Sequence, residues 1–251
     1  MAGEFWLSDA AWRLIVPHLP TNQPGARRKD DRTLLSVIVH ALRSGCRWQD
    51  CPSFYVPSTT VYNRFHRWSQ RGIWQALFAA LAAETGGDIA MLDSSAVRRT
   101  APLAAEKGGQ AQAIGRSHGG RTTKIHALVD GAGRLLHFQL SPGHRQDITL
   151  AQPLLAQTVP SRRLLADKGY DASALRRFLA ERGTEAVIPN KTNRRRILYP
   201  FDAELCRQRN VIERMFAKLK DFRRLATRYD KLTRNFASAI ALCATLPWWT
   251  H

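Results

Sequence analysis

The chain has 251 residues, and its 38 Lys and Arg side chains against 20 Asp and Glu give a net charge of +18. A hydrophobic fraction of 44% excludes an intrinsically disordered chain. No run of about 18 apolar residues predicts a membrane span. No N-terminal pattern predicts a secretory signal. The four Cys form no dense framework. We therefore expect a cytoplasmic protein with no membrane partner.

The positive charge is concentrated in two parts of the chain. Residues 191–234 contain fourteen Lys and Arg against five Asp and Glu, and residues 21–75 contain nine against three. The sign reverses in residues 76–96, which contain three acidic and no basic side chains. Clustered cations of this kind indicate a polyanion partner, most often nucleic acid.

Residues 1–87 predict a helical region. Apolar spacing and capping residues favour four helices, at 9–18, 33–43, 58–72 and 73–84. The third helix places Asn63, Arg64 and Arg67 near its polar side, and this pattern resembles a DNA-binding helix-turn-helix. The connection before the third helix is longer than usual, so a helical bundle with a solvated basic face remains the alternative.

Residues 88–251 predict an α/β domain with a mixed sheet. Short apolar runs indicate strands, first in antiparallel and then in parallel order. One lies within residues 88–97 and ends at Asp93, and the others are at 124–129, 135–140, 163–166 and 186–188. We expect helices at 144–156 and 174–182, and one long amphipathic helix from Asp202 onward. Residues 101–122 are rich in Gly and Ala and predict a flexible loop.

Two aspartates follow apolar runs at predicted strand ends. Asp93 comes after Met91-Leu92, and Asp167 comes after Leu164-Leu165-Ala166. Functional groups gather at strand ends in open α/β sheets, and carboxylates there can bind Mg²⁺. Helix capping or turn formation is the alternative for each aspartate taken alone.

A third carboxylate, Glu213, lies on the polar side of the predicted C-terminal helix. At 100° per residue, Arg209, Lys220 and Arg224 fall within about 40° of it. This stripe is either a solvated ion pair or a metal ligand flanked by cations that hold phosphates. Together with Asp93 and Asp167, the stripe makes chemical sense as a site for two divalent ions, Mg²⁺ or Mn²⁺, that promote phosphoryl transfer.

The sequence around Glu213 resembles a known family. Residues 209–231 closely resemble the C-terminal catalytic segment of bacterial insertion-sequence transposases of the type 5 family, in the DDE superfamily. Residues 92–95 and 164–171 resemble the family's two Asp motifs, and residues 107–126 resemble its linker and second strand. The resemblance covers nearly the whole chain.

This resemblance implies a ribonuclease-H-like core, with Asp93, Asp167 and Glu213 as the metal-binding catalytic triad. The family's Tyr-Arg-Glu-Lys signature falls on Arg209, Glu213 and Lys220, but Cys206 stands at the Tyr position. Thr100 stands where relatives often have His. The implied partners are double-stranded DNA, both the terminal inverted repeats and the target. A homodimer or higher oligomer on DNA, at a bacterial nucleoid, is expected.

The leading hypothesis is a DNA transposase that cleaves insertion-sequence ends and joins the 3′-OH to target DNA. One alternative is an inactive, transposase-derived protein that binds specific DNA through its helical region. Another is a stand-alone metal-dependent nuclease, which would cut DNA without joining the ends.

Overall fold

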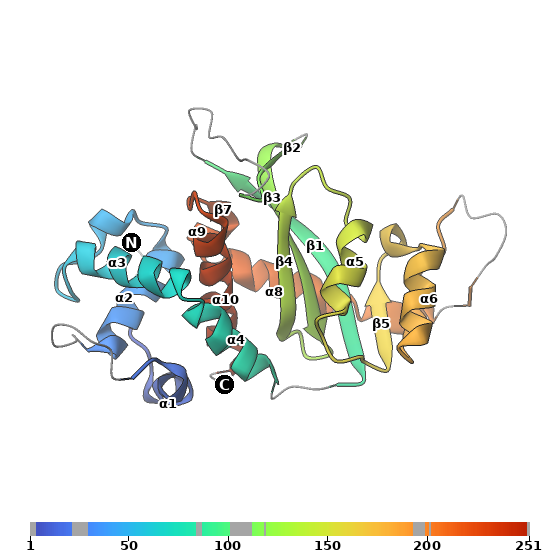
Figure 1. Ribbon diagram of the computed structural model, residues 1–251, viewed down its shortest axis with the longest axis horizontal. Coiled ribbons are helices and arrows are strands. Elements are labelled where there is room, and N and C mark those ends of the chain that lie inside the picture. The colour runs from blue at the N-terminus through green and yellow to red at the C-terminus, as the bar shows by residue number, and fades with distance from the viewer. Residues whose placement is uncertain are drawn as a thin grey trace. The chain divides into compact units, whose positions relative to one another are not determined.

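A computed structural model describes residues 4–21, 30–83, 87–100, 112–117, 119–192, 199–200 and 202–249 (Figure 1). The chain divides into two compact units. The helical unit consists of Met1–Leu81, Arg99–Leu103 and Leu219–His251, and the sheet unit consists of Ala82–Arg98 and Ala104–Lys218.

The N-terminal helices of the helical unit form much as predicted. They are α1 (Asp9–Ile15), α2 (Asp31–Ser44), α3 (Ser58–Gln70) and α4 (Ile73–Ala83), with short 3-10 turns η1 (Val16–His18) and η2 (Trp48–Asp50). Asp30 caps α2 by accepting from the N–H groups of Arg32 and Thr33, and Gly45 ends it with a φ of +76°. The apolar sides of these helices bury Trp68 and Trp74 almost completely.

The C-terminal part of the chain completes the same helical unit. It contains α9 (Arg223–Ala226), the two-residue strand β7 (Thr227–Arg228) and α10 (Thr233–Trp249). Phe236 and Ile240 of α10 are fully buried, and Ser238 accepts a hydrogen bond from Gln75 of α4. The compact units therefore differ in their residues from the predicted segments 1–87 and 88–251. The difference arises because α10 packs on the N-terminal helices.

The predicted single helix from Asp202 is wrong. Three separate helices occupy this stretch, α7 (Ala203–Arg207), α8 (Asn210–Lys220) and α9. The amphipathic pattern continues through the breaks, so periodicity alone does not show them. Burial of Leu225 and Arg224 in the helical unit redirects the chain after α8, and tertiary packing overrides helical propensity here.

The sheet unit contains a mixed sheet. Its strands are β1 (Ile89–Arg99), β2 (Gly115–Ser117), β3 (Gly120–Asp130), β4 (Leu135–Pro142), β5 (Arg163–Ala166) and β6 (Glu185–Val187). The order is β2-β3-β1-β5-β6, with β4 also paired to β3. The pairs among β1, β2, β3 and β4 are antiparallel, and β5 pairs in parallel with β1 and β6.

This sheet, following N-terminal helices, confirms the predicted fold class, an α/β protein with a ribonuclease-H-like mixed sheet. β1 is longer than predicted and does not end at Asp93, because its second half pairs with β3. Strand β2 lies within the stretch predicted to be a loop. Residues 101–111 of that stretch are outside the described residues.

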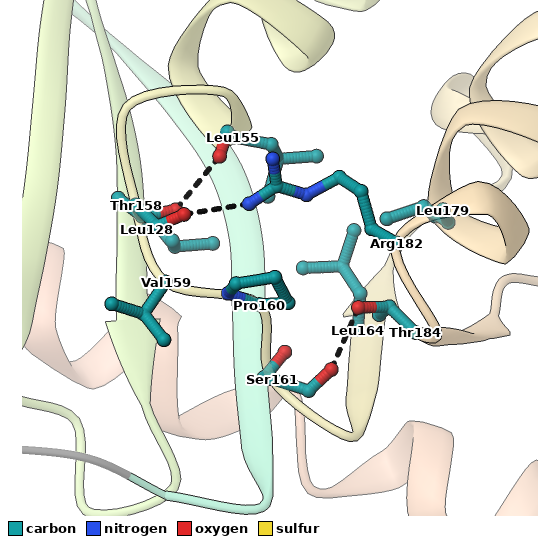
Figure 2. A pocket seen from close by; sticks show the side chains of 10 residues that line it. All are labelled: Leu128, Leu155, Thr158, Val159, Pro160, Ser161, Leu164, Leu179, Arg182 and Thr184. Atoms are coloured by element: carbon teal, nitrogen blue, oxygen red, sulfur yellow. Dashed lines mark hydrogen bonds between the residues drawn. The ribbon is translucent and has the colours of Figure 1, made fainter.

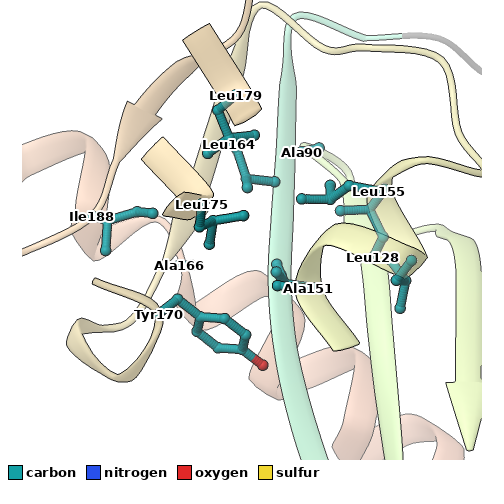
Figure 3. Packing of buried hydrophobic residues seen from close by; sticks show 12 residues of the cluster. Ala90, Leu128, Ala151, Leu155, Leu164, Ala166, Tyr170, Leu175, Leu179 and Ile188 are labelled. Atoms are coloured by element: carbon teal, nitrogen blue, oxygen red, sulfur yellow. The ribbon is translucent and has the colours of Figure 1, made fainter. Parts of the chain in front are cut away.

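Helices α5 (Ile148–Leu155) and α6 (Ser173–Glu181) cover one face of the sheet, and α8 lies at the other face (Figure 1). Alternate residues of β1 and β5 point to the α5 side and form an apolar core with these helices (Figure 3). Its buried members include Ala90, Leu92, Leu128, Ala151, Leu154, Leu164, Ala166, Leu175 and Leu179. The core fixes β1 and β5 side by side and so fixes the residues that follow their parallel pairing.

Candidate active site

Asp93 and Asp167 occupy equivalent positions on neighbouring parallel strands. The β1–β5 pairing ends with Leu92 opposite Ala166, and each aspartate is the next residue. Both side chains are half-buried. The register therefore brings together the two carboxylates that the sequence places 74 positions apart.

The orientation of the Asp167 side chain is fixed by the turn that follows it. Asp167 Oδ1 accepts a hydrogen bond of 2.8 Å from the N–H of Gly169, at the start of the 3-10 turn η3 (Lys168–Tyr170). A Cβ at Gly169 would lie 2.9 Å from the same oxygen, so glycine permits the close turn. One carboxylate oxygen of Asp167 is thus engaged by the backbone.

Glu213 is linked to Asp93 through one guanidinium. Arg209 Nη1 lies 2.7 Å from Asp93 Oδ2, and Arg209 Nη2 lies 3.1 Å from Glu213 Oε1. Arg209 immediately precedes α8, and Glu213 lies one turn further along the chain, on the exposed side of the helix. The contact with Glu213 is the ion pair that the helical spacing predicts, and the contact with Asp93 comes from the tertiary fold.

The electrostatics around Asp93 favour a cation. Burial raises the pKa of Asp93 above its usual range, and the neighbouring Asp167 carboxylate adds to this effect. The N–H of Ser94 and the Arg209 guanidinium oppose it by stabilising the charged form. The net upward shift shows that these partners do not fully compensate the buried negative charge.

The donor set also fits a hard divalent ion. Asp93, Asp167 and Glu213 offer the carboxylate oxygens that Mg²⁺ and Mn²⁺ prefer. In the described part of the chain, however, no three His, Cys, Asp or Glu side chains are grouped closely enough to hold a metal ion. Glu213 is connected to Asp93 through the guanidinium of Arg209.

Arg224 does not lie on a stripe with Glu213, because the helix on which that prediction depends is interrupted. Its side chain is only 6% exposed and belongs to the helical unit. Arg224 Nη1 donates to the carbonyl of Cys46 at 2.8 Å, and the guanidinium lies 4.7 Å from the centre of the Trp48 ring. Lys220, at the end of α8, is exposed.

The predicted DNA-binding residues of α3 differ in their surroundings. Asn63 and Arg67 are exposed. Arg64 instead forms an ion pair with Asp31 of α2 and lies over the Trp68 ring. Asn63 and Arg67 therefore keep their side chains on the surface of α3, whereas Arg64 also ties α3 to α2. Their contact with DNA stays a prediction.

Cys206 and Thr100 stand at positions where the resemblance described above implies Tyr and, often, His. Cys206 lies in α7, and burial raises the pKa of its thiol. The charges of Arg209 and Asp167 act on the same thiol, so Cys206 lies near the carboxylates. Thr100 is exposed and directly follows β1.

Two further aspartates have roles that the sequence does not reveal. The simplest interpretation of Asp147 and Asp171 is helix capping, but neither caps a helix with its side chain. Asp147 forms an ion pair with Lys124 of β3 at 2.9 Å. The nearly buried Asp171 accepts from Arg176 Nε and from the N–H of Lys191, both at 2.9 Å. The contacts of Asp147 with Lys124 and of Asp171 with Lys191 join residues 23 and 20 positions apart, and no local signal predicts them.

A small pocket lies near the start of β5, at the end of the strand away from Asp167 (Figure 2). Two hydrogen bonds tie its loop to the end of α6 and the residues before β6. Arg182 Nη2 donates to the carbonyl of Thr158, and Thr184 Oγ1 donates to that of Ser161. The pocket is separate from the carboxylates and contains no Asp, Glu, His or Cys.

Two family models match the chain. Residues 7–78 match the family described as "Putative transposase of IS4/5 family", and residues 84–247 match "Transposase DDE domain". The second match covers well over half of the sequence. The chain belongs to the DDE transposase family. This assignment confirms the family resemblance of the sequence around Glu213. Asp93, Asp167 and Glu213 all lie within the matched residues 84–247.

Two relatives of this DDE transposase chain are named as putative transposases of insertion sequence elements. It is 37% identical over 128 residues to the "Putative transposase for insertion sequence element IS6501" of Brucella ovis, covering 51% of this chain and 98% of that protein. It is 30% identical over 138 residues to the "Putative transposase for insertion sequence element IS402" of Burkholderia cepacia, covering 50% of this chain and 63% of the relative.

Among solved structures, the DDE transposase chain overlaps weakly with "Mos1 transposase paired-end complex with left transposon end". The TM-score is 0.27 at 12% identity, covering 89% of this chain and 79% of the other. The fold assignment rests on the strand order and not on this overlap. No helix in the described ranges combines the length and apolar character needed to cross a membrane.

Proposed function

We propose that this DDE transposase chain cleaves DNA at insertion-sequence ends and transfers the freed 3′-OH into target DNA. The observation that carries the proposal is the placement of Asp93 and Asp167 at equivalent positions where the parallel pairing of β1 and β5 ends. The guanidinium of Arg209 forms ion pairs with both Asp93 and Glu213. Membership of the DDE transposase family supports the proposal, because all three carboxylates lie within the matched residues 84–247.

Asp93, Asp167 and Glu213 would hold the divalent ions, Mg²⁺ or Mn²⁺, and we infer two of them. When bound, such ions activate the attacking oxygen and stabilise the leaving oxygen of an in-line phosphoryl displacement. The raised pKa of Asp93 supports this assignment, because a nearby cation would relieve its uncompensated charge.

Arg209 has two roles in this proposal. Without metal, its guanidinium neutralises Asp93 and Glu213 at 2.7 and 3.1 Å and prevents two carboxylates from facing each other unpaired. With DNA present, the same guanidinium is placed to bind a phosphate beside the scissile bond, because Arg can pair with phosphate through two N–H groups. Exposed Asn63 and Arg67 on α3 are proposed to contact the terminal repeat.

The test uses three conservative variants, Asp93→Asn, Asp167→Asn and Glu213→Gln. Each should lose detectable cleavage of a duplex that carries the element's end in Mg²⁺, while gel-shift binding to that duplex remains. Glu185→Gln is the matched control, because Glu185 is exposed and pairs with Arg163 at the start of β6, away from the carboxylates.

Retained cleavage in any of the three variants would remove that residue from the triad. A wild-type chain that binds the duplex but does not cut it would instead favour the inactive DNA-binding protein. In that case Cys206→Tyr, which restores the family residue, should produce cleavage. Cutting without joining would favour a nuclease.

A further inference from the structure

Two arginines face each other across the β2–β3 hairpin. Arg116 of β2 lies directly opposite Arg121 of β3 in the register, so their side chains point to the same face. Both are exposed, and neither forms an ion pair or hydrogen bond with any residue that the structure describes. Like charges directly opposite each other destabilise an antiparallel pair. Fold stability therefore does not explain this pair.

The surrounding sequence does not neutralise these charges either. Residues 112–117 and 119–124 contain three basic side chains, Arg116, Arg121 and Lys124, and no acidic one. Lys124 is already paired with Asp147. The two guanidiniums consequently form a concentrated positive site on a short hairpin.

Close packing holds the hairpin in place. A Cβ at Gly115 would lie 2.2 Å from His144 Nδ1, and one at Gly143 would lie 1.7 Å from Thr122 Oγ1, so the β4–α5 loop approaches the hairpin closely. Thr122 Oγ1 also donates to Ser117 Oγ at 2.9 Å across the two strands. The backbone that carries the arginine pair is thus fixed relative to the rest of the sheet.

The register places the arginine pair on the same face of the sheet as Asp93. Asp93 lies opposite Ala127 of β3, and Arg121 is six residues from Ala127 along an unbroken strand. Side chains separated by an even number of strand residues share a face. Six residues at about 3.3 Å each put the pair about 20 Å from Asp93, in the hairpin at one end of the sheet (Figure 1).

We propose that Arg116 and Arg121 bind backbone phosphates of the duplex being cleaved, about six base pairs from the scissile phosphate. The distance of about 20 Å equals about six steps of 3.4 Å along a duplex strand. Phosphates bound by the two guanidiniums offset their mutual repulsion, and each guanidinium donates to one phosphate. The contact is independent of base sequence, because it reaches only the backbone. This inference rests on the proposed cleavage function.

The first measurement is the salt dependence of DNA binding by the full chain. Mixed-sequence duplexes, with Ca²⁺ in place of Mg²⁺, are titrated between about 50 and 200 mM salt. Loss of two phosphate contacts should lower the slope of log affinity against log salt by about 1.8 in Arg116→Gln/Arg121→Gln. Between those concentrations, wild-type affinity should then fall about 12-fold more than that of the variant.

Two variants control this measurement. Arg177→Gln removes an exposed cation from α6, which covers the other face of the sheet, and should change the slope much less. Arg116→Lys/Arg121→Lys keeps both charges and should retain most of the slope. The Gln variant should be at least as stable as wild type in thermal unfolding, because a like-charge pair is removed. A slope for the Gln variant equal to that of Arg177→Gln would overturn the proposal.

The second measurement identifies which duplex the pair contacts. In single-turnover cleavage of a long duplex that carries the element's end, the Gln variant should be about ten-fold slower than wild type. Cutting the duplex back to about four base pairs on the contacted side should remove that difference. Normal cleavage with impaired joining to target would overturn the proposal, since the pair would then hold target DNA. If wild type cuts no duplex, the cleavage function fails, and an unchanged salt slope would separately reject the arginine pair.

Discussion

At the scale of single residues, the candidate site consists of two aspartates, one glutamate and one arginine that pairs with Asp93 and Glu213. The contact between Arg209 and Glu213 follows from a spacing of four and is visible in the sequence. The contact between Arg209 and Asp93 joins residues 116 positions apart and depends on how β1 and α8 pack. The sequence therefore predicts the members of the site, but not that Arg209 connects them.

Arg224 shows why a helical wheel has limited reach. The wheel assumes a continuous helix and places Arg224 beside Glu213. The chain instead leaves the helix after Lys220, and Arg224 is taken up by the carbonyl of Cys46 and the ring of Trp48. Side-chain spacing predicts neighbours only within one unbroken helix.

His126 provides a prediction at this scale. It is buried on β3, with Nε2 2.7 Å from Ser141 Oγ, and burial lowers its pKa to about 4. Asp147 opposes this shift, and Lys124 and Arg145 reinforce it. The unfolded chain takes up the proton first, so the free energy of unfolding should fall as the pH drops from 6.5 to about 4. The loss contributed by His126 should be about 3 kcal/mol.

Urea unfolding of wild type and His126→Gln across this pH range checks the prediction. Gln cannot titrate there and keeps a polar group near Ser141. The difference in unfolding free energy between the two proteins should change by about 3 kcal/mol between pH 7 and 4. A difference that does not vary with pH would show that the pKa of His126 is the same in the folded and unfolded chain.

At the scale of helices and strands, the boundaries that the sequence predicts best are those set by local signals. β5 is found at the predicted residues 163–166, because its apolar run is short and bounded by polar residues. α2 ends at Gly45, whose left-handed backbone suits a C-terminal cap. β2 has no comparable signal, since three residues that include one glycine do not form a strand pattern. Only its pairing with β3 defines it.

Gly143 provides a prediction for the packing of these elements. Because a Cβ added at Gly143 would lie only 1.7 Å from Thr122 Oγ1, Gly143→Ala must push the β4–α5 loop away from β3. We expect the free energy of unfolding to fall by about 1 to 3 kcal/mol, the usual cost of overpacking. Denaturant unfolding of the full chain measures this loss.

Gly131→Ala is the matched control for this variant. Gly131 lies in the β3–β4 turn, and its added Cβ would meet nothing closer than Ile89 Cβ at 3.9 Å. Its effect should stay below about 0.5 kcal/mol. Equal unfolding midpoints for the two Ala variants would show that the loop near Gly143 adjusts without cost.

At the scale of the whole molecule, the order of strands and helices is largely predictable, whereas the grouping of segments into compact units is not. Alternation of apolar runs with amphipathic stretches predicts the α/β sheet unit. The assignment of residues 219–249 to the helical unit depends on the buried faces of α10, such as Phe236 and Ile240. An apolar helix can pack against any apolar surface, so its partner cannot be read from its own sequence.

This grouping predicts the behaviour of a fragment. Residues 1–87 alone should not fold stably, because α1, α2 and α3 would lose the packing that they make with α10. Co-expression with residues 219–251 should restore dispersed amide resonances and cooperative unfolding. In the full chain, Phe236→Ala should cost about 3 to 5 kcal/mol. A well-folded 1–87 fragment would show instead that α10 is dispensable for the helical unit.

The position of α10 in the sequence means that it is synthesised well after the N-terminal helices with which it packs. About 150 residues separate the end of α4 from the start of α10, and a ribosome adds about 5 to 20 residues per second. The helix that carries Asn63 and Arg67 thus waits roughly 8 to 30 seconds for its last packing partner. By then the segments that bear Asp93 and Asp167 have already been synthesised, so the DNA contact proposed for α3 forms only after the proposed catalytic carboxylates have been made.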